Sequence, residues 1–231
     1  MAKSFFITSS GTEIGKTFVT ASLIHQISHA GKTVAAFKPL LSGFDENAVE
    51  TTDTGILLNA LGRDLSPANI DAMTPWRFKA ALSPDMAAAR EGKTIEFAEL
   101  TEFTSAVLES NEDIALIEGV GGIMAPVGTG HTVLDWVKSG HCPALLVVGG
   151  YLGTISHTLT AAKALESVGI RLAGIVLSAR GELPVAPEET RAALMRFLSD
   201  TPVAILPDCG ATDDAWRNAP DLLDQLCLLD A

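Results

Sequence analysis

The sequence predicts an α/β fold: a three-layer sandwich in which a mostly parallel central sheet of about seven strands is covered by helices on both faces. Short apolar runs alternate along the chain with amphipathic helical stretches. The runs are continuously apolar, which is typical of strands that crossover helices bury on both faces. We expect the 231 residues to form one domain, because this length is sufficient for a full hydrophobic core.

The first strand and the first helix enclose a phosphate-binding sequence. Residues 5–7 predict a buried strand, a turn of small residues follows, and Gly-Lys-Thr then opens a helix that runs to about residue 30. This layout is that of a P-loop, where backbone N–H groups and the helix dipole favour phosphate. We expect Lys16 to neutralise the β- and γ-phosphates and Thr17 to reach the metal. Ser10 stands where the usual pattern has glycine, so an ordinary helix N-terminus is the alternative.

Two further polar residues follow the next predicted elements. Residues 33–37 predict a second strand, which Lys38 ends. Ligands of open parallel sheets lie beyond the carboxyl ends of strands, so Lys38 is expected at the same rim as the P-loop. A solvated lysine at a strand end is the alternative. Asp53 precedes a predicted helix over residues 55–61, and from the residues alone it is best interpreted as a structural helix N-terminal carboxylate.

An acidic residue ends the strand predicted from residue 113 onwards. The apolar run stops at Glu118, and a glycine-rich turn over residues 119–122 follows. Metal-binding acids of P-loop enzymes lie at the end of a core strand beside the P-loop strand. The glycines let the backbone approach a ligand closely. Glu118 is therefore a candidate metal ligand, with a paired core carboxylate as the alternative.

The remaining chain continues the alternation. Ser83 and Pro84 are expected to cap and open a helix through residue 90. The small-residue loop 149–156 opens another helix through residue 168, whose N-terminus is a second potential anion site. His157, near this start, is interpreted as a packed or surface residue. The other expected segments are strands at 143–148, 171–177 and 203–206, helices at 95–110, 131–140, 187–199 and 221–229, and an irregular stretch at 74–82.

Composition excludes several classes of function. A formal net charge of −12 argues against broad nucleic-acid or anionic-membrane binding. The cysteines at positions 142, 209 and 227 have no metal-site spacing and predict free thiols rather than a zinc site or disulfides. The N-terminus does not have the pattern of a signal peptide, and no apolar run is long enough to span a bilayer. We expect a soluble cytoplasmic protein.

Taken together, the order and spacing of these motifs resemble the dethiobiotin synthetase family along nearly the whole chain. Members of this family use ATP to close the ureido ring in biotin synthesis. The motifs that carry the resemblance are Thr12-Glu13-Ile14-Gly15-Lys16-Thr17, Lys38-Pro39, Ser42-Gly43, Asp53, Ser83-Pro84, Glu118-Gly119-Val120-Gly121-Gly122, Asp135-Trp136-Val137, Leu146-Val147-Val148-Gly149 and Leu152-Gly153.

The resemblance implies a role for each matching residue. Thr17, Asp53 and Glu118 would ligate Mg²⁺ bound to ATP, which changes the interpretation of Asp53. Lys16 and Lys38 would surround the transferring γ-phosphoryl group, and Thr12 and Ser42 would contact the substrate carbamate and phosphate. Lys38, Lys16 and Thr12 are the implied catalytic residues. The implied contacts to the nucleotide come from Glu13, Ile14, Gly15, Lys16, Thr17, Glu118, Gly119, Val120, Gly121, Ser178 and Pro207.

The resemblance also implies the substrates and the assembly. One amine of 7,8-diaminononanoate takes up CO₂ as a carbamate, ATP phosphorylates it, and the second amine closes the ring with release of phosphate. Backbone N–H groups at Leu152, Gly153 and Thr154 would hold the substrate carboxylate across the interface of a homodimer. The implied steps need alignment and charge neutralisation rather than a protein nucleophile.

Three serines depart from the family pattern. Ser9 stands where family loops commonly have glycine, and Ser156 replaces an asparagine near the carboxylate-binding helix start. Ser178 stands where an asparagine that reads adenine is expected, and a hydroxyl cannot donate and accept as an amide does. We therefore expect altered base selectivity, with a broader range of nucleotides.

Three other classes of protein fit the sequence less well. Partitioning ATPases and nitrogenase iron proteins carry an additional P-loop lysine, which residues 9–11 do not supply, and iron–sulfur binding needs cysteine pairs. Cobyrinate-type amide ligases need an appended glutaminase domain. A non-catalytic nucleotide-binding regulator would not need Lys38, Asp53 and Glu118 together.

Overall fold

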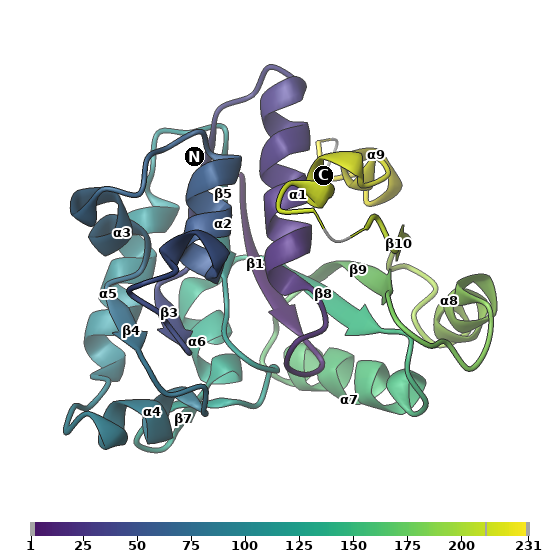
Figure 1. Ribbon diagram of the computed structural model, residues 1–231. Coiled ribbons are helices and arrows are strands. Elements are labelled where there is room, and N and C mark those ends of the chain that lie inside the picture. The colour runs from purple at the N-terminus through teal and green to yellow at the C-terminus, as the bar shows by residue number, and fades with distance from the viewer. Residues whose placement is uncertain (1–2, 211, 230–231) are drawn as a thin grey trace.

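A computed structural model describes residues 3–210 and 212–229 (Figure 1). Within them, six parallel strands form the central sheet in the order β10-β9-β8-β1-β5-β2. In that spatial order the strands are β10 (Val203–Pro207), β9 (Leu172–Ala179), β8 (Ala144–Gly149), β1 (Lys3–Ser9), β5 (Ile114–Glu118) and β2 (Val34–Phe37). The P-loop strand β1 therefore lies between β8 and β5, with its carboxyl end beside the end of β5.

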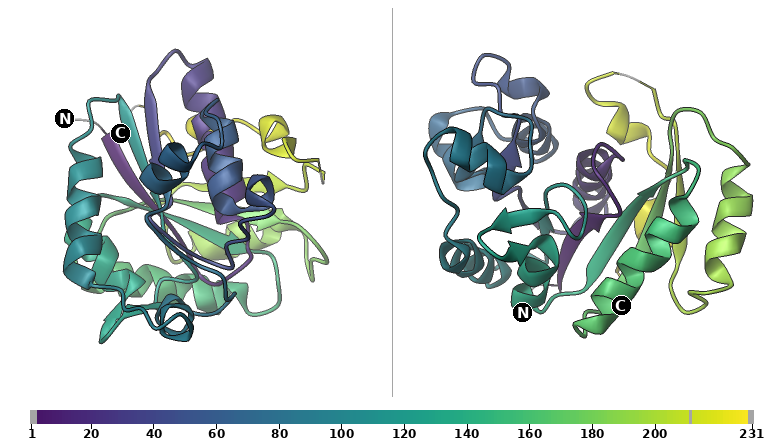
Figure 2. Two further views of the ribbon diagram at one scale, coloured as in Figure 1. Left: turned by 60° about the vertical axis from the view of Figure 1, so that its left-hand side comes forward. Right: turned by 90° about the horizontal axis from the view of Figure 1, so that it is seen from below.

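Helices cover both faces of this sheet (Figure 2). One face packs against α1 (Lys16–His29), α2 (Asp53–Ala60), α3 (Pro67–Met73) and α9 (Leu222–Gln225). The other packs against α4 (Pro84–Arg90), α5 (Phe97–Leu108), α6 (Val133–Gly140) and α7 (Thr154–Ser167), and α8 (Pro187–Met195) lies beside α7. The predicted three-layer α/β sandwich is confirmed.

Side chains of β1 alternate between the two hydrophobic cores. Phe6 packs into the core under α5, α6 and α7, whereas Phe5 and Ile7 pack into the core under α1. Successive strand residues point to opposite faces, so both faces of β1 are buried. This explains why the strand is continuously apolar in sequence.

The strand count and several boundaries differ from the sequence prediction. The central sheet contains six strands within the described residues, not about seven. Two pairs lie outside it: β3 (Leu40–Ser42) with β4 (Trp76–Phe78), and β6 (Pro126–Gly128) with β7 (His131–Thr132). Pro39 separates β3 from β2, because proline lacks the N–H that continues a ladder.

Several elements differ from the prediction in type, length or capping. The segment 74–82, predicted as irregular, contains β4, and residues 67–73 form α3, which the sequence did not indicate. The C-terminal helix covers residues 222–225 rather than 221–229. Pro84 opens α4 as expected, but Ser83 at the cap position makes no side-chain capping hydrogen bond. Short one-turn elements depend on neighbouring packing, which local sequence does not contain.

The Asp135-Trp136-Val137 motif has a structural role. Asp135 and Thr132 form a capping box at the start of α6, with Asp135 Oδ2 accepting from the Thr132 backbone N–H at 2.8 Å. The fully buried Trp136 ring packs edge-to-face on Phe6 at 4.9 Å, and its indole N–H donates to Thr104 Oγ1 at 2.7 Å. The motif therefore anchors α6 against the P-loop strand.

The three cysteines are free thiols with different environments. Burial raises the pKa of the Cys142 thiol to about 12, whereas Cys227 is exposed. Because the thiolate is the reactive form, we expect an aromatic disulfide reagent at pH 8 to modify Cys227 readily and Cys142 only after unfolding. A Cys142→Ser variant should lose the unfolding-dependent thiol alone. Rapid modification of all three native thiols would contradict this burial.

None of the helices in residues 3–210 and 212–229 has the length and hydrophobicity to cross a lipid bilayer.

Candidate nucleotide and metal site

The P-loop connects the carboxyl end of β1 to the N-terminus of α1. Gly15 precedes the helix with φ of 98°, a left-handed conformation that favours glycine. Side-chain space is also limited there, because a Cβ on Gly15 would lie 3.3 Å from Ser178 Oγ. Glu13 has φ of 58°, which is uncommon outside glycine and marks a tightly shaped loop. The loop thus turns the chain so that the first N–H groups of α1 are available to an anion.

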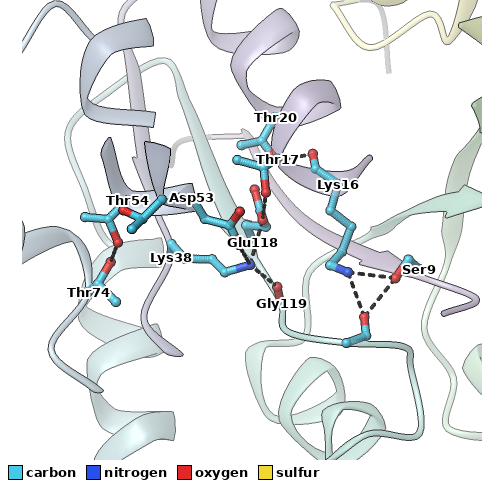
Figure 3. A network of polar contacts seen from close by, with 12 residues as sticks. Ser9, Lys16, Thr17, Thr20, Lys38, Asp53, Thr54, Thr74, Glu118 and Gly119 are labelled. Atoms are coloured by element: carbon cyan, nitrogen blue, oxygen red, sulfur yellow. Dashed lines mark hydrogen bonds and ion pairs between the residues drawn. The ribbon is translucent and has the colours of Figure 1, made fainter. Parts of the chain in front are cut away.

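Lys16 lies folded against the glycine-rich turn that follows β5. Its ammonium donates to Gly121 O at 2.9 Å and to Ser9 Oγ at 3.0 Å (Figure 3). Ser9 Oγ also lies 2.6 Å from Gly11 O and 2.8 Å from Gly121 O. The serine that replaces the family glycine therefore links the P-loop to this turn. Burial, and then the charge of Lys38, lower the pKa of Lys16 from 10.5 to about 8.

Lys38, Asp53, Glu118 and Thr17 form one polar cluster (Figure 3). The buried Lys38 ammonium lies 2.7 Å from Glu118 Oε1, 2.9 Å from Asp53 Oδ2 and 2.9 Å from Gly119 O. Thr17 Oγ1 donates to Glu118 Oε1 at 2.8 Å. An ammonium has three N–H donors, so each donor of Lys38 has an acceptor in this arrangement.

Opposite charges stabilise one another in this cluster. Burial alone lowers the pKa of Lys38, but Asp53 and Glu118 outweigh burial and raise that pKa above its ordinary value. Burial alone raises the pKa of Asp53, but the charge and hydrogen bond of Lys38 outweigh it and lower that pKa. Lys38 and Asp53 are therefore both charged at neutral pH. Asp53 is the more accessible partner, because its side chain is 32% exposed and that of Glu118 is fully buried.

The oxygen atoms of this cluster fit Mg²⁺. Glu118 Oε2 is buried and has no hydrogen-bond partner among the described residues, so it has an acceptor position available for a cation. Carboxylate and hydroxyl oxygens are ligands that Mg²⁺ prefers, and Mg²⁺ commonly uses one or two carboxylates together with water and phosphate. Among the described residues, no three or more His, Cys, Asp or Glu side chains are grouped so that they could hold a metal ion by themselves.

The cluster lies in a cleft of about 1130 Å³. Most predicted site residues line it: Thr12, Glu13, Gly15, Lys16, Thr17, Lys38, Ser42, Asp53, Val120 and Gly121. Glu118 and Gly119 are not among the lining residues, but both accept hydrogen bonds from Lys38, which is. Ile14 and Ser178 instead line a smaller neighbouring cavity of about 290 Å³. Pro207 ends β10 and, among the described residues, lines neither cavity.

Residues 152–154 lie outside this cleft in the described chain. Leu152 and Gly153 precede α7, and Thr154 is its first residue. Leu152 is 89% exposed. Thr154 is buried, and its hydroxyl donates to Gly149 O. The exposed His157 accepts or donates at 2.9 Å with the Tyr151 hydroxyl, which supports its interpretation as a surface residue.

The cleft also contains residues that the sequence analysis missed. Phe18, Arg180, Thr212, Asp213 and Trp216 line its end near β9 and β10. Arg180 could have been noticed, because it directly follows a core strand, where the carboxyl-end rule applies. No local signal marks Asp213 or Trp216, which lie in a loop and a short 3₁₀ turn.

Comparison with known proteins agrees with this geometry. A family model described as an AAA domain matches residues 3–214. An ATP-dependent dethiobiotin synthetase BioD of Acidiphilium cryptum is 43% identical over 213 residues, which are 92% of this chain and 96% of that protein. The protein of the same name from Methylobacterium nodulans is 41% identical, covering 84% of this chain and 88% of its own length.

Solved structures share the fold at lower identity. The septum site-determining protein MinD of Pyrococcus horikoshii, solved with Mg-ADP, has a TM-score of 0.60 and 19% identity over 94% of this chain and 86% of its own. MinD of Aquifex aeolicus has a TM-score of 0.56 and 17% identity, and the match covers 97% of this chain and 90% of its own. These likenesses show a P-loop NTPase-like fold, and the relatives at 43% and 41% identity, aligned along most of both chains, show that the chain belongs to the ATP-dependent dethiobiotin synthetase family.

Proposed function

We propose that this chain is a C–N-forming ligase that converts 7,8-diaminononanoate, CO₂ and ATP to dethiobiotin, ADP and phosphate in biotin biosynthesis. The observation that carries the proposal is the convergence of Lys16, Lys38, Asp53 and Glu118 at the start of α1. Phosphoryl transfer depends mainly on such positioning and charge neutralisation. We propose that residues 1–231 form one ligase domain that acts in the cytoplasm, where ATP is available.

The proposed reaction has three steps. One amine of the diamine adds to CO₂ and loses a proton, giving a carbamate. A carbamate oxygen attacks the γ-phosphorus of ATP, and ADP leaves, giving a carbamic-phosphoric anhydride. The second amine attacks the carbonyl carbon, loses a proton and expels phosphate, which closes the cyclic urea. None of these steps requires a covalent bond to the protein.

Two lysines are proposed to act on the transferring phosphoryl group. Lys16 is the first residue of α1 and Lys38 directly follows β2, so the two ammonium groups would approach it from different elements. Because all three donors of Lys38 already have acceptors, Lys38 has to give up at least one contact to donate to phosphate or carbamate. Asp53 is the more exposed of its two acidic partners, which favours its contact as the one exchanged.

The other assigned residues hold the substrates. Thr12 and Ser42 line the same cleft and are proposed to contact carbamate and phosphate oxygens. Thr17, Asp53 and Glu118 are proposed to hold Mg²⁺, which supplies charge neutralisation to phosphate oxygens when bound. The proposed nucleotide contacts come from Glu13, Ile14, Gly15, Gly119, Val120, Gly121, Ser178 and Pro207.

We propose a homodimer in which the substrate carboxylate is held across the interface. Leu152, Gly153 and Thr154 lie outside the cleft of their own subunit, so they would meet the substrate of a partner subunit.

The experiment that tests the function measures phosphate release with Mg-ATP and bicarbonate, with and without 7,8-diaminononanoate, while mass spectrometry follows dethiobiotin. We expect phosphate and dethiobiotin to appear in equal amounts and only when the diamine is present. ATP binding without diamine-dependent turnover would reject the synthetase and favour a related amide ligase or a nucleotide-binding regulator.

A further inference from the structure

The cleft continues past the P-loop to residues that the proposed chemistry does not use. The lysine–carboxylate cluster comes from β2, β5 and α2, on one side of β1. At the opposite end, Phe18, Arg180, Asp213 and Trp216 line the cleft, beyond the carboxyl ends of β9 and β10. A nucleotide whose terminal phosphate lies at the cluster therefore extends its nucleoside towards these residues.

Arg180 presents a planar cation at this end of the cleft. Its guanidinium carbon lies 5.3 Å from the centre of the Phe18 ring, and Phe18 directly follows Thr17 in the P-loop helix. Guanidinium planes stack on aromatic faces, and they stack on nucleobases in the same way. Arg180 is exposed, so its outer face is accessible to a ligand.

Ser178 lines the smaller cavity, which it shares with Arg180, but it offers little to the edge of a base. It is 3% exposed, and its hydroxyl faces Gly15 in the wall of the smaller cavity. A hydroxyl also lacks the paired donor and acceptor of an amide. Binding of the base thus depends on stacking against its ring face rather than on hydrogen bonds to its edge. Every nucleobase has a π-face, so such stacking does not select one base.

We propose that Arg180, supported by Phe18, is the residue on which the nucleobase stacks, and that the protein consequently accepts purine and pyrimidine nucleotides with similar affinity. This inference deepens the proposed function and rests on it, because it concerns the nucleotide that supplies the phosphoryl group. Stacking on a cation is tolerant of the base, so Arg180 contributes affinity without selecting adenine.

The test is titration calorimetry in Mg²⁺ with ADP, GDP, CDP, UDP and inorganic tripolyphosphate. We expect the four dissociation constants for nucleotides to agree within about tenfold. Arg180→Ala should weaken all four by about tenfold, the effect of losing one stacked base, and leave tripolyphosphate binding unchanged. Arg180→Lys keeps the charge without the plane, so it should resemble Arg180→Ala rather than the wild type.

Arg217 offers a matched control. Its guanidinium carbon lies 4.7 Å from the centre of the Trp216 ring, a similar stacking contact, but Arg217 does not line the cleft of the described chain. Arg217→Ala should therefore bind all five ligands as the wild type does.

Three results would overturn the proposal: wild-type preference for ADP above about 100-fold, full nucleotide affinity in Arg180→Lys, or equal weakening of tripolyphosphate and ADP in Arg180→Ala. The titrations contain no diamine, so they separate this inference from the proposed reaction. Absence of dethiobiotin synthesis with the expected titrations would reject the reaction and retain the role of Arg180.

Discussion

Replacing Lys38 by methionine is expected to lower kcat for dethiobiotin formation by about 100- to 1,000-fold, the usual effect of removing one preorganised charged donor. The methionine side chain is of similar length but carries no donor for the transferring phosphoryl group. The variant also leaves Asp53 and Glu118 without the cation that lies 2.9 and 2.7 Å from them. We therefore expect tighter binding of Mn²⁺ alone than in the wild type, measured by electron paramagnetic resonance.

Lys93→Met is a suitable control for this variant. Lys93 also pairs with a carboxylate, 2.8 Å from Glu91, but the pair is exposed and lies outside the polar cluster. Its loss should change neither kcat nor Mn²⁺ affinity, because exposed pairs contribute little. Circular dichroism and ADP binding verify that Lys38→Met is folded. A folded Lys38→Met enzyme with wild-type kcat would reject the role of Lys38.

Glu118→Gln should weaken Mn²⁺ binding in the presence of ADP by at least about tenfold and lower kcat by about 100-fold. Glutamine preserves the volume but removes a charge next to the buried Lys38 ammonium. The buried Lys38 ammonium then has one carboxylate fewer to balance its charge, so the free energy of unfolding should fall. Electron paramagnetic resonance gives the Mn²⁺ affinity, and urea unfolding gives the stability.

Asp135→Ala provides the contrast for Glu118→Gln. Asp135 is also an acidic residue of a family motif, but its side chain completes the capping box in which Thr132 is the N-cap of α6. Its removal should lower the free energy of unfolding by about 1 kcal/mol, as loss of a cap does, without changing Mn²⁺ affinity. If Glu118→Gln lost stability but bound Mn²⁺ normally, Glu118 would be a structural partner of Lys38 and not a metal ligand.

Much of the lysine–carboxylate end of the candidate site was predictable from local sequence. Lys16 and Thr17 follow a strand and a small-residue loop, and Lys38 and Glu118 each end an apolar run. Parallel strands place their carboxyl ends at one edge, so these side chains had to approach one another. The structure joins three of them in one polar network, with Thr17 Oγ1 and Lys38 Nζ 2.8 and 2.7 Å from Glu118 Oε1. The Lys16 ammonium lies in the same cleft but donates to Ser9 and Gly121.

The place of Asp53 in the site could not be predicted from the residues around it. In sequence it is a carboxylate in the first turn of a helix, and it is also that in the structure. Its distance of 2.9 Å to Lys38 depends on how α2 packs beside α1. The family resemblance, not the residue pattern, identified this carboxylate as part of the site.

The sequence by itself determined the α/β class, the P-loop and the strand-end residues, because these follow from hydrophobic patterns and chain direction over a few residues. Tertiary structure alone decided that Ser9 meets Gly121, 112 residues away, and that Phe18, Arg180 and Asp213 share one end of the cleft. It also decided that Ser178 faces Gly15. Such contacts join distant segments whose approach is set by the packing of whole helices and strands, which no local pattern encodes.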